Sequence, residues 1–303
     1  MIMETIHKPI VSVCLITYNH EQFLERCINS ILSQEVEFEY EIIIGEDCSK
    51  DGTRAICEKY YRLHPNKIKL ILHETNVGLI ENYISIMQEA RGEYIAVCSG
   101  DDYWCDSLKL NKQISFLNSN QDYVMCFTNA YEESNFSWQG YRKELFTNVE
   151  DREYTGHDII LKWIIPASSV VFKNHLIDFS FLRRRTFYAE DLVQYLKLNE
   201  HGKLRGMSDI TTTYTRHENA ITSNIISREK TLKKYVVNLL SIDVELNYKY
   251  RQIIKKDLSI VYYNEAKYMF KHVSCFTALT YFARAFWYNP ICTINLLYKS
   301  VID

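Results

Sequence analysis

Short apolar runs and helical stripes alternate along the first third of the chain. Residues 10–17, IVSVCLIT, form an apolar run rich in β-branched side chains, which is typical of a buried strand. Between residues 18 and 34 the apolar positions change to helical spacing. They form one stripe of Phe23, Cys27 and Ile31 beside Leu24, Ile28 and Leu32. Asn19 stands at the expected N-cap of this helix, with Gln22 at the reciprocal capping position.

The same change of period recurs along the chain as far as Ser99. Further strands are expected at residues 40–47, 67–74 and 93–99, and further helices at residues 54–63 and 79–87. Pro65 lies just beyond the first of these two helices, where it disfavours continuation. Strands that alternate with helices through short links predict a parallel sheet with helices on both faces.

The ends of the expected strands are rich in polar and acidic residues. Right-handed crossovers bring the carboxyl ends of parallel strands to one edge, where such sheets bind ligands. The residues expected there are Thr17, Tyr18, Asn19, Glu46, Asp47, Asp51, Asn76, Gly78, Ser99, Gly100, Asp101 and Asp102. Gly and Asp are ordinary turn residues, but packing does not explain the whole set. The adjacent aspartates of YIAVCSGDDYW, residues 94–104, are therefore predicted to line a ligand crevice.

A nucleotide is the first candidate ligand for such a crevice. No GxGxxG follows the first strand and no GxxxxGK[ST] occurs, which argues against an NAD-dependent oxidoreductase and a P-loop enzyme. An acidic crevice repels a diphosphate unless a divalent cation lies between them. Asp101 suits Mg²⁺ or Mn²⁺, which bind one or two carboxylates together with substrate phosphates. Asp47 is placed to accept a hydrogen bond from the base, and Tyr18 to lie against its face.

Composition narrows the class of protein further. The chain has 303 residues, a formal net charge of −3 and a pI of about 6.3, so no basic field argues for nucleic acid. Its nine cysteines include no CxxC pair, which favours a reducing compartment over a zinc site or a disulfide framework. No secretory signal is expected at the N-terminus. The longest apolar stretch, residues 276–298, is interrupted by Arg284, Asn289 and Pro290, so we expect a cytoplasmic protein that is soluble or touches a membrane from outside.

Four motifs occur in a fixed order, each at the end of an expected strand. They are SVCLITYNHEQFLERCINSILSQ, EIIIGEDCSKDGT, NVG and GEYIAVCSGDDYW. With them residues 9–104 resemble the family 2 glycosyltransferases of the GT-A fold, and within these the subgroup that builds bacterial capsules, O-antigens and related surface glycans such as lipooligosaccharides. The resemblance implies an α/β fold with a Rossmann-like mixed sheet flanked by helices. It divides the chain into a nucleotide-binding half, 1–104, an acceptor half, 105–225, and a helical C-terminal extension, 226–303.

The resemblance also implies roles for individual residues. Asp47 matches the acid that reads the base, and Asp101 matches the metal-binding acid of the DxD signature. Ser99 stands where that signature has its first acid, often near the ribose. Asp102 either shares the metal or supports Asp101. The alternative is a purely structural role as a helix or turn cap. The implied nucleotide-binding residues are Thr17, Tyr18, Asn19, Asp47, Asn76, Asn82, Ser99, Gly100, Asp101 and Arg216, and the implied metal ligands are Asp101, Asp102 and His217.

The second half of the domain is expected to bind the acceptor and supply the base. A strand is expected at residues 123–134 and another after Pro166, with an irregular segment between them up to about residue 160. Glu190 and Asp191 open a helix, where the helix dipole alone favours acids. In the resemblance Asp191 matches the general base that removes a proton from the acceptor hydroxyl, and Glu190 is the second candidate.

A further strand is expected at residues 213–215, followed by Arg216 and His217. Tyr214-Thr215-Arg216-His217 resembles the Tyr-Arg-x-His ending of family members, whose His helps to hold the metal or the diphosphate. A lone His is more often structural, and Arg216 is an alternative partner for the diphosphate.

After residue 226, Lys- and Tyr-rich segments predict two or three amphipathic helices. They are expected to pack on the catalytic domain or on a second subunit, which would make the protein a homo-oligomer. The alternative is an interfacial helix that brings the enzyme to a lipid-linked acceptor at the inner face of the bacterial membrane, with Lys267, Lys271 and Arg284 at the headgroup boundary.

The expected function is metal-dependent, inverting transfer of one sugar from a nucleotide-diphosphate donor. The donor is expected to be a UDP-sugar carrying a hexose or an N-acetylhexosamine. The acceptor is expected to be a hydroxyl of a growing bacterial surface glycan or a lipid-linked saccharide. The QxxRW motif of processive members is absent, which predicts one sugar per encounter. The alternative is an inactive nucleotide-sugar-binding subunit, which Ser99 suggests.

Overall fold

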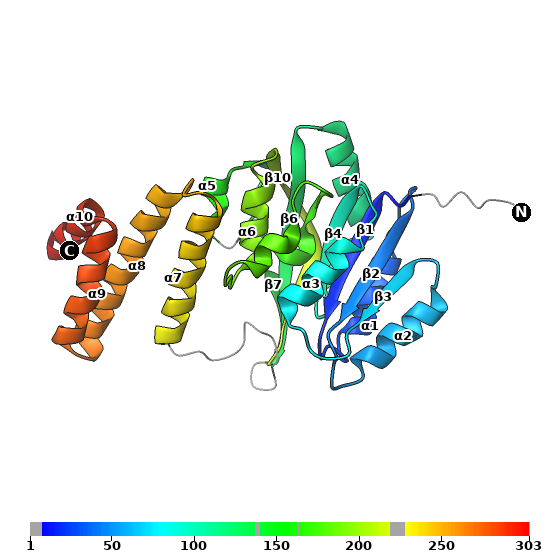
Figure 1. Ribbon diagram of the computed structural model, residues 1–303, viewed down its shortest axis with the longest axis horizontal. Helices are drawn as coiled ribbons and strands as arrows, with labels where there is room; N and C mark the ends of the chain where they lie inside the picture. Colours follow the sequence, from blue (N-terminus) through cyan, green and yellow to red (C-terminus); the bar gives the residue numbers. More distant parts are fainter. Residues whose placement is uncertain (1–7, 137–139, 163, 219–227, 303) are drawn as a thin grey trace, which may run out of the picture. The chain divides into compact units, whose positions relative to one another are not determined.

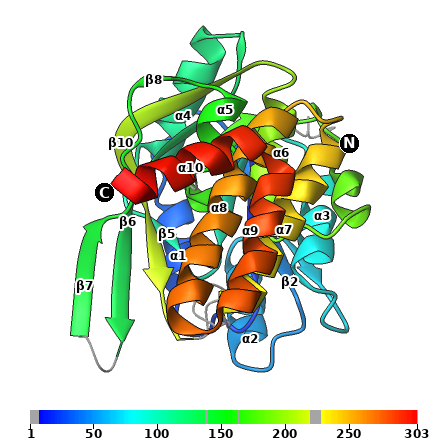
Figure 2. The same ribbon diagram turned by 90° about the vertical axis from the view of Figure 1, so that its left-hand side faces the viewer.

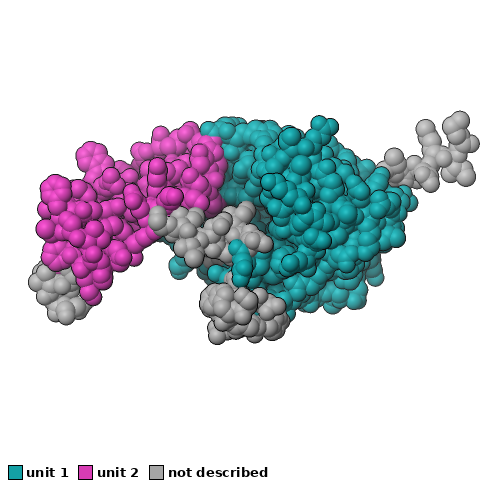
Figure 3. All heavy atoms as spheres, turned by 90° about the horizontal axis from the view of Figure 1, so that it is seen from below, with its two compact units in different colours: residues 1–184, 190–225 teal, residues 185–189, 226–303 magenta. Residues whose placement is uncertain are grey.

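The computed structural model describes residues 8–136, 140–162, 164–218 and 228–302. The chain divides into two compact units, which Figure 3 distinguishes by colour. One unit consists of residues 1–184 and 190–225. The other consists of residues 185–189 and 226–303.

A mixed sheet forms the centre of the first unit (Figure 1). Within the described residues it has ten strands, eight of them in the order β3-β2-β1-β4-β9-β6-β10-β5, while β7 pairs with β6 and β8 with β10. Four neighbouring strands pair in parallel: β1 Val11–Thr17, β2 Tyr40–Glu46, β3 Ile68–Leu72 and β4 Tyr94–Ser99. The others are β5 Tyr103–Trp104, β6 Tyr123–Phe136, β7 Gly140–Leu145, β8 Arg152–Tyr154, β9 Val171–Lys173 and β10 Lys203–Arg216.

Helices cover both faces of the parallel strands. The helices of this unit are α1 Leu24–Leu32, α2 Thr53–Leu63, α3 Leu79–Gln88, α4 Lys109–Ser119, α5 Gly156–Ile159 and α6 Glu190–Leu198, with the 3₁₀ turns η1 Ala167–Ser169 and η2 Phe179–Arg183. Val13 and Leu15 of β1 share a core cluster with buried residues of α1 and α4. On the opposite face the thiol of Cys14 lies 4.0 Å from the carbonyl oxygen of Ile86 in α3. Alternation along β1 thus separates two helical layers, as the sequence predicts.

Two local predictions were wrong. Asn19 is not the N-cap of the first helix, because α1 begins at Leu24 with Phe23 as its N-cap. Asn19 instead adopts a left-handed conformation, with φ of 55°, from which its side chain binds the backbone of the loop after β2. The residues after Pro166 first form η1, and the strand β9 begins only at Val171.

Four further elements were not foreseen. The segment before residue 160, expected to be irregular, contains β7, β8 and α5. The helix α4 was also missed. Its buried face includes Lys109 and Gln113, polar residues that obscure the apolar stripe by which a helix is recognised.

The second unit is helical. It contains α7 Arg228–Glu245, α8 Arg251–His272, α9 Cys275–Tyr288 and α10 Pro290–Ile302, where the sequence predicted two or three helices. In Figure 2 α8 and α9 lie side by side and α10 runs across them. The unit has its own core, which includes Leu239, Ile242, Leu258 and Tyr262. Among the described residues, no helix combines the length and apolarity needed to cross a membrane.

Candidate active site

Hydrogen bonds join the loops that follow β1 and β2 at the carboxyl edge of the sheet. Asn19 makes two of these bonds: its N–H donates to Ser49 Oγ at 2.9 Å, and its side-chain oxygen accepts the N–H of Lys50 at 2.8 Å. The N–H of His20 donates to Thr53 Oγ1 at 2.8 Å. The loops are therefore fixed relative to each other by side chains rather than by strand pairing.

Gly100 brings the loop after β4 against the end of β1. A Cβ atom at this position would lie 2.7 Å from Thr17 Oγ1 and 2.8 Å from His20 Nδ1, so only glycine permits the approach. Thr17 Oγ1 and His20 Nδ1 also share a hydrogen bond of 3.2 Å. Tyr18, the next residue after Thr17, is half-buried. The predicted residues of the first and fourth strand ends therefore meet.

Asp101 lies between two imidazole rings. Its Oδ2 is 3.3 Å from Nε2 of His217 and 3.8 Å from Nε2 of His20. The three side chains are largely buried, and Phe23 packs on the His217 ring with 4.5 Å between ring centroids. Burial acts to raise the pKa of Asp101, but the hydrogen bond from His217 and the charge of His20 outweigh it and lower the pKa to about 2. Asp101 is therefore a carboxylate at neutral pH.

Asp102 is turned into the protein. Its Oδ2 accepts a hydrogen bond from Ser168 Oγ at 2.6 Å, and its Oδ1 accepts from the N–H of Thr215 at 3.0 Å. Burial and the adjacent charge of Asp101 raise its pKa well above the usual range. Ser168 Oγ also accepts the N–H of Ser99 at 3.1 Å. Because protein donors occupy both oxygens, the geometry fits the supporting role of Asp102 better than the metal-sharing one.

The Ser99 side chain contributes to the lowered pKa of Asp101. The residue that replaces the first acid of the signature thus favours the ionised form of the second acid. A hydroxyl cannot supply the negative charge that a carboxylate would bring to this position.

Asp47 is buried at the end of β2, and backbone groups of the loop after β3 occupy its carboxylate. Oδ1 accepts the N–H of Val77 at 2.7 Å, and Oδ2 accepts the N–H of Gly78 at 3.0 Å. The amide of Asn76 donates to the Asp47 carbonyl oxygen at 3.2 Å. Asp47 and Asn76, both predicted to bind the nucleotide, are therefore neighbours. Each carboxylate oxygen has two lone pairs, so Asp47 retains acceptor capacity for a base.

Two predicted nucleotide-binding residues have their side-chain contacts elsewhere. The buried amide of Asn82 donates to the Gly45 carbonyl oxygen at 2.9 Å and so holds α3 on β2. The guanidinium of Arg216 donates to Glu132 of β6 at 2.7 Å. Of the pair Arg216–His217, the structure brings only the histidine into hydrogen-bonding contact with Asp101.

Glu190 and Asp191 form the first turn of α6, as predicted. Burial and the charge of Asp191 raise the pKa of Glu190 to about 7. Asp191 Oδ1 accepts the N–H of Leu192 at 2.8 Å, and the side chain lines a small cavity beside Lys162 and Tyr195. Two adjacent acids of which one binds its proton more tightly are suited to proton transfer, because one can remain ionised while the other stays neutral.

The sequence reasoning missed His20. The residue directly follows the predicted group Thr17, Tyr18 and Asn19 at the end of the first strand, so its position was a usable signal. His20 was missed because it was assigned to the first turn of the following helix. That helix begins four residues later, at Leu24.

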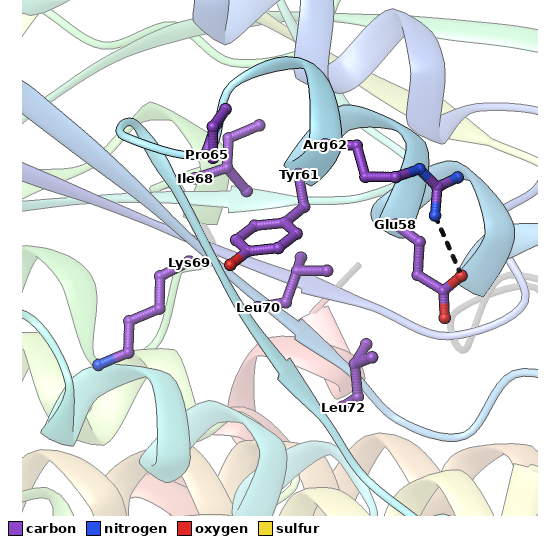
Figure 4. Close-up of a pocket in the computed structure, with 8 residues that line it drawn as sticks. All are labelled: Glu58, Tyr61, Arg62, Pro65, Ile68, Lys69, Leu70 and Leu72. Atoms are coloured by element: carbon purple, nitrogen blue, oxygen red, sulfur yellow. Dashed lines mark ion pairs between the residues drawn. The ribbon is translucent and has the colours of Figure 1, made fainter.

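The chain also has an open hollow away from these acids. Figure 4 shows it between α2 and β3. Its volume is about 690 Å³. Its lining residues are Glu58, Tyr61, Arg62, Pro65, Ile68, Lys69, Leu70 and Leu72. None of the predicted site residues lines it, and a diphosphate–metal group needs a carboxylate cluster that the hollow does not offer.

The donor atoms around Asp101 fit a divalent cation that also binds a substrate phosphate. Within the described residues no group of three or more His, Cys, Asp and Glu side chains forms a complete metal cage. Asp101 Oδ2 and His217 Nε2 nevertheless lie 3.3 Å apart, close enough to bind one ion together. An imidazole beside a carboxylate suits Mn²⁺ better than Mg²⁺, which prefers oxygen ligands.

A family model, described as Glycosyl transferase family 2, matches residues 12–186, more than half of the chain. The chain therefore belongs to glycosyl transferase family 2, and the resemblance found in the sequence is confirmed.

Two curated relatives resemble different lengths of this chain. The uncharacterized protein Rv1520 of Mycobacterium tuberculosis is 31% identical over 170 residues, which cover 54% of this chain and 46% of that protein. The chain thus spans about half the length of the curated relatives it matches first. The putative teichuronic acid biosynthesis glycosyltransferase TuaG of Bacillus subtilis is 28% identical over 221 residues, covering 72% of this chain and 83% of that protein.

Two solved structures share the fold. Residues 1-349 of TarS of S. aureus, in complex with UDP-GlcNAc, have a TM-score of 0.61 at 23% identity, covering 91% of this chain and 81% of that fragment. The mannosyltransferase PcManGT of Pyrobaculum calidifontis, in complex with GDP-Man and Mn²⁺, has a TM-score of 0.55 at 14% identity. The match covers 98% of this chain and 81% of the PcManGT chain. The prediction of a GT-A glycosyltransferase fold with a mixed sheet and C-terminal helices is confirmed.

Proposed function

We propose that the protein transfers a single sugar, with inversion, from a nucleotide-diphosphate donor to an acceptor hydroxyl in a divalent-metal-dependent reaction. The observation that carries the proposal is the ionised Asp101 beside His217 at the end of β4, in a chain of glycosyl transferase family 2. The proposed roles are assigned to three consecutive segments of the chain. Residues 1–104 bind the nucleotide, residues 105–225 bind the acceptor, and residues 226–303 form an extension.

The metal is proposed to be Mn²⁺ or Mg²⁺, held by Asp101 and His217, with Asp102 behind them. When bound, such an ion stabilises the negative charge that develops on the leaving diphosphate. The solved complex of PcManGT with Mn²⁺ supports a metal in this fold. Asp101 contributes the negative charge, His217 contributes a nitrogen ligand, and His20 supports the Asp101 carboxylate from its other side.

The nucleotide is proposed to lie along the carboxyl edge of β1, β2 and β4. In this arrangement Asp47 accepts a hydrogen bond from the base and Tyr18 packs on its face. Thr17, Asn19, Asn76, Ser99 and Gly100 complete the binding edge, Asn82 supports it through Gly45, and Arg216 pairs with the diphosphate if it leaves Glu132. A UDP-sugar is the preferred donor, which the UDP-GlcNAc complex of TarS supports.

Asp191 is proposed as the general base, with Glu190 as the second candidate. A proton held by Glu190, whose pKa is raised to about 7, leaves Asp191 ionised and able to accept the proton of the attacking hydroxyl. The acceptor is proposed to be a bacterial surface glycan or a lipid-linked saccharide at the cytoplasmic face of the membrane, for which TuaG is the supporting relative.

The test is calorimetric titration of UDP and UDP-GlcNAc into the protein with Mn²⁺ or with excess chelator, followed by donor hydrolysis. Binding is expected only with Mn²⁺. Asp101→Asn is expected to lower metal-dependent turnover about 1,000-fold, since metal stabilisation of the transition state is worth several kcal/mol. Asp106→Asn, which removes a carboxylate paired with Lys112, is the matched control and should keep full turnover. Equal binding in chelator would refute the metal dependence.

The second candidate is a nucleotide-sugar-binding subunit without catalysis, which Ser99 in place of an acid favours. The two are separated by Asp191→Asn. For the enzyme this variant binds the donor normally but turns it over at least about 100-fold more slowly, the usual contribution of a general base. For the binding subunit the wild type and the variant are equally inactive.

A further inference from the structure

The C-terminal helices carry a concentration of exposed, large apolar side chains. The most exposed lie between the end of α8 and the start of α10: Phe270 (71%), Val273 (63%), Phe276 (77%), Leu279 (64%), Trp287 (84%) and Ile291 (74%). Exposed apolar residues scattered singly are ordinary on protein surfaces. A concentration of this kind along consecutive helices is typical of an interaction site.

On α9 the exposed apolar residues form one stripe. Phe276, Leu279, Phe286 and Trp287 recur at helical spacing, so they share a face about 100° wide. Ala278 and Ala285 lie on the opposite face and are buried. The helix is therefore apolar on two faces, one of which the described part of the chain covers. A helix that is apolar all round is normally covered on every side.

Within residues 266–302 the charged side chains have one sign, and the nearest acids, Glu229 and Glu265, act on Tyr281 of α9 from other helices. Residues 266–302 contain no Asp or Glu, whereas Lys267, Lys271 and Arg284 are exposed there. Residues 226–303 as a whole have twelve Lys and Arg against six Asp and Glu, although the complete chain has a net charge of −3. The extension is thus a basic segment on an acidic protein.

Three acids of this unit form ion pairs, and Asp257 accepts a hydrogen bond from the Tyr235 hydroxyl at 2.6 Å. Glu265 binds Arg228, Asp243 binds Arg251 and Glu245 binds Arg185, with N–O distances of 2.7, 3.2 and 3.6 Å. The basic side chains beside the apolar stripe therefore favour an external anion over a neighbouring carboxylate.

We propose that this face binds the anionic surface of a phospholipid membrane. The stripe of α9 lies among the upper acyl chains, and Lys267, Lys271 and Arg284 contact the lipid phosphates. Exposed Trp and Phe beside Lys and Arg are the composition of helices that lie in a bilayer interface. A symmetric dimer through the same face would bring these cations together with no carboxylate from residues 266–302 to pair them, which disfavours a second copy as the occupant. The inference is independent of the proposed reaction, because it concerns binding in the absence of a donor.

The first experiment is sedimentation of the full chain with vesicles. Vesicles that contain phosphatidylglycerol should bind about 100-fold more tightly than pure phosphatidylcholine, given about fivefold per basic residue, and salt should weaken the binding. Lys267→Gln with Lys271→Gln should weaken it about 25-fold. The matched control is Lys255→Gln with Lys256→Gln, which makes the same charge change on exposed residues about 18 Å earlier along α8 and should change it less than about twofold.

The second experiment reports the depth of α9. Brominated lipids should quench the tryptophan emission of the wild type, and Trp287→Phe should bind equally well but lose most of this quenching. Trp287→Ser should weaken binding roughly tenfold through lost apolar contact. All these side chains are exposed, so circular dichroism and melting of the variants should match the wild type.

Three results would overturn the proposal. They are equal binding to neutral and anionic vesicles, absence of vesicle binding by the wild type, and a dimer in solution that Trp287→Ser dissociates. None of them bears on donor binding at Asp101, so the membrane surface and the proposed reaction fail separately.

Discussion

His20 shows how a single side chain completes a site that the motifs only outline. Its ring contacts Thr17 on one side and lies 3.8 Å from Asp101 on the other. Burial lowers the pKa of His20, although the charge of Asp101 opposes this shift. His20 thus lies against the carboxylate that is proposed to hold the metal, and we expect it to support that carboxylate.

We predict that His20→Gln weakens Mn²⁺ binding about 10- to 100-fold while the fold stays intact, which is the usual effect of removing a residue that orients a metal ligand. Mn²⁺ is titrated in the presence of UDP and followed by electron paramagnetic resonance. His64→Gln, at the end of α2, is the control and should bind Mn²⁺ like the wild type. Unchanged affinity in His20→Gln would show that Asp101 needs no such support.

Glu190 gives a prediction for the pH dependence of stability. Its pKa rises from an ordinary 4.5 to about 7 on folding, so the folded chain binds this proton more tightly than the unfolded chain. The free energy of unfolding should therefore fall as the pH rises from 4.5 to 7, by up to about 3 kcal/mol from this group. Urea unfolding of Glu190→Gln should show a shallower decline over the same window. An identical pH slope in the variant would contradict the assignment.

At the scale of elements, the turn η1 lies between the acids at the end of β4 and side chains that α4 and β5 contribute. Lys109 of α4 is fully buried, and its ammonium donates to the Ser169 carbonyl oxygen at 3.2 Å and to Gln113. Burial lowers the pKa of Lys109 to about 8. Trp104 Nε1 donates to the Ser168 carbonyl oxygen at 3.0 Å. The turn is therefore held in the orientation from which Ser168 binds Asp102.

Ser168→Ala should destabilise the protein by about 1–3 kcal/mol, because it leaves the buried Asp102 oxygen and the Ser99 N–H without their partner. Urea denaturation measures the difference. Ser180→Ala in η2 removes a hydroxyl that donates to the exposed Asp178 and should change the free energy of unfolding by less than about 0.5 kcal/mol. Equal effects of the two substitutions would mean that the Asp102 network contributes nothing specific to stability.

At the scale of the whole molecule, the chain contains two separate cores. The first lies between the sheet and its helices and includes Val13, whereas the second lies among the C-terminal helices and includes Leu258. Two cores of this kind can open separately, because local unfolding follows cooperative packing units rather than the chain as a whole.

Leu258→Ala should destabilise the helical unit by about 2–5 kcal/mol, the usual range for emptying a buried leucine site. Hydrogen exchange should then accelerate for the amides of α7 and α8 and stay unchanged for β1 and β2. Val13→Ala is the converse control and should accelerate exchange in the sheet. Faster exchange in both units with either substitution would show that they unfold together.

The sequence alone determined the strands and helices of the first hundred residues and the polar character of the strand ends. Periodicity reports burial locally, so each of these elements could be recognised from its own residues. The pair Glu190–Asp191 at the start of α6 was recognisable for the same reason, because acids in a first helical turn are a local signal.

The family resemblance grouped Asp101 with His217, but only the tertiary structure shows how they meet and which other charged groups surround them. The two residues are 116 positions apart in the chain and come together because β10 runs beside β6 and ends near the loop after β4. In the same fold Arg216 forms an ion pair with Glu132, and the side chain of His20, rather than that of Arg216, lies beside Asp101. Pairing between distant strands depends on the packing of the complete sheet, so no local pattern records it. The sequence thus placed the acids at one edge, and the packed sheet selected their partners.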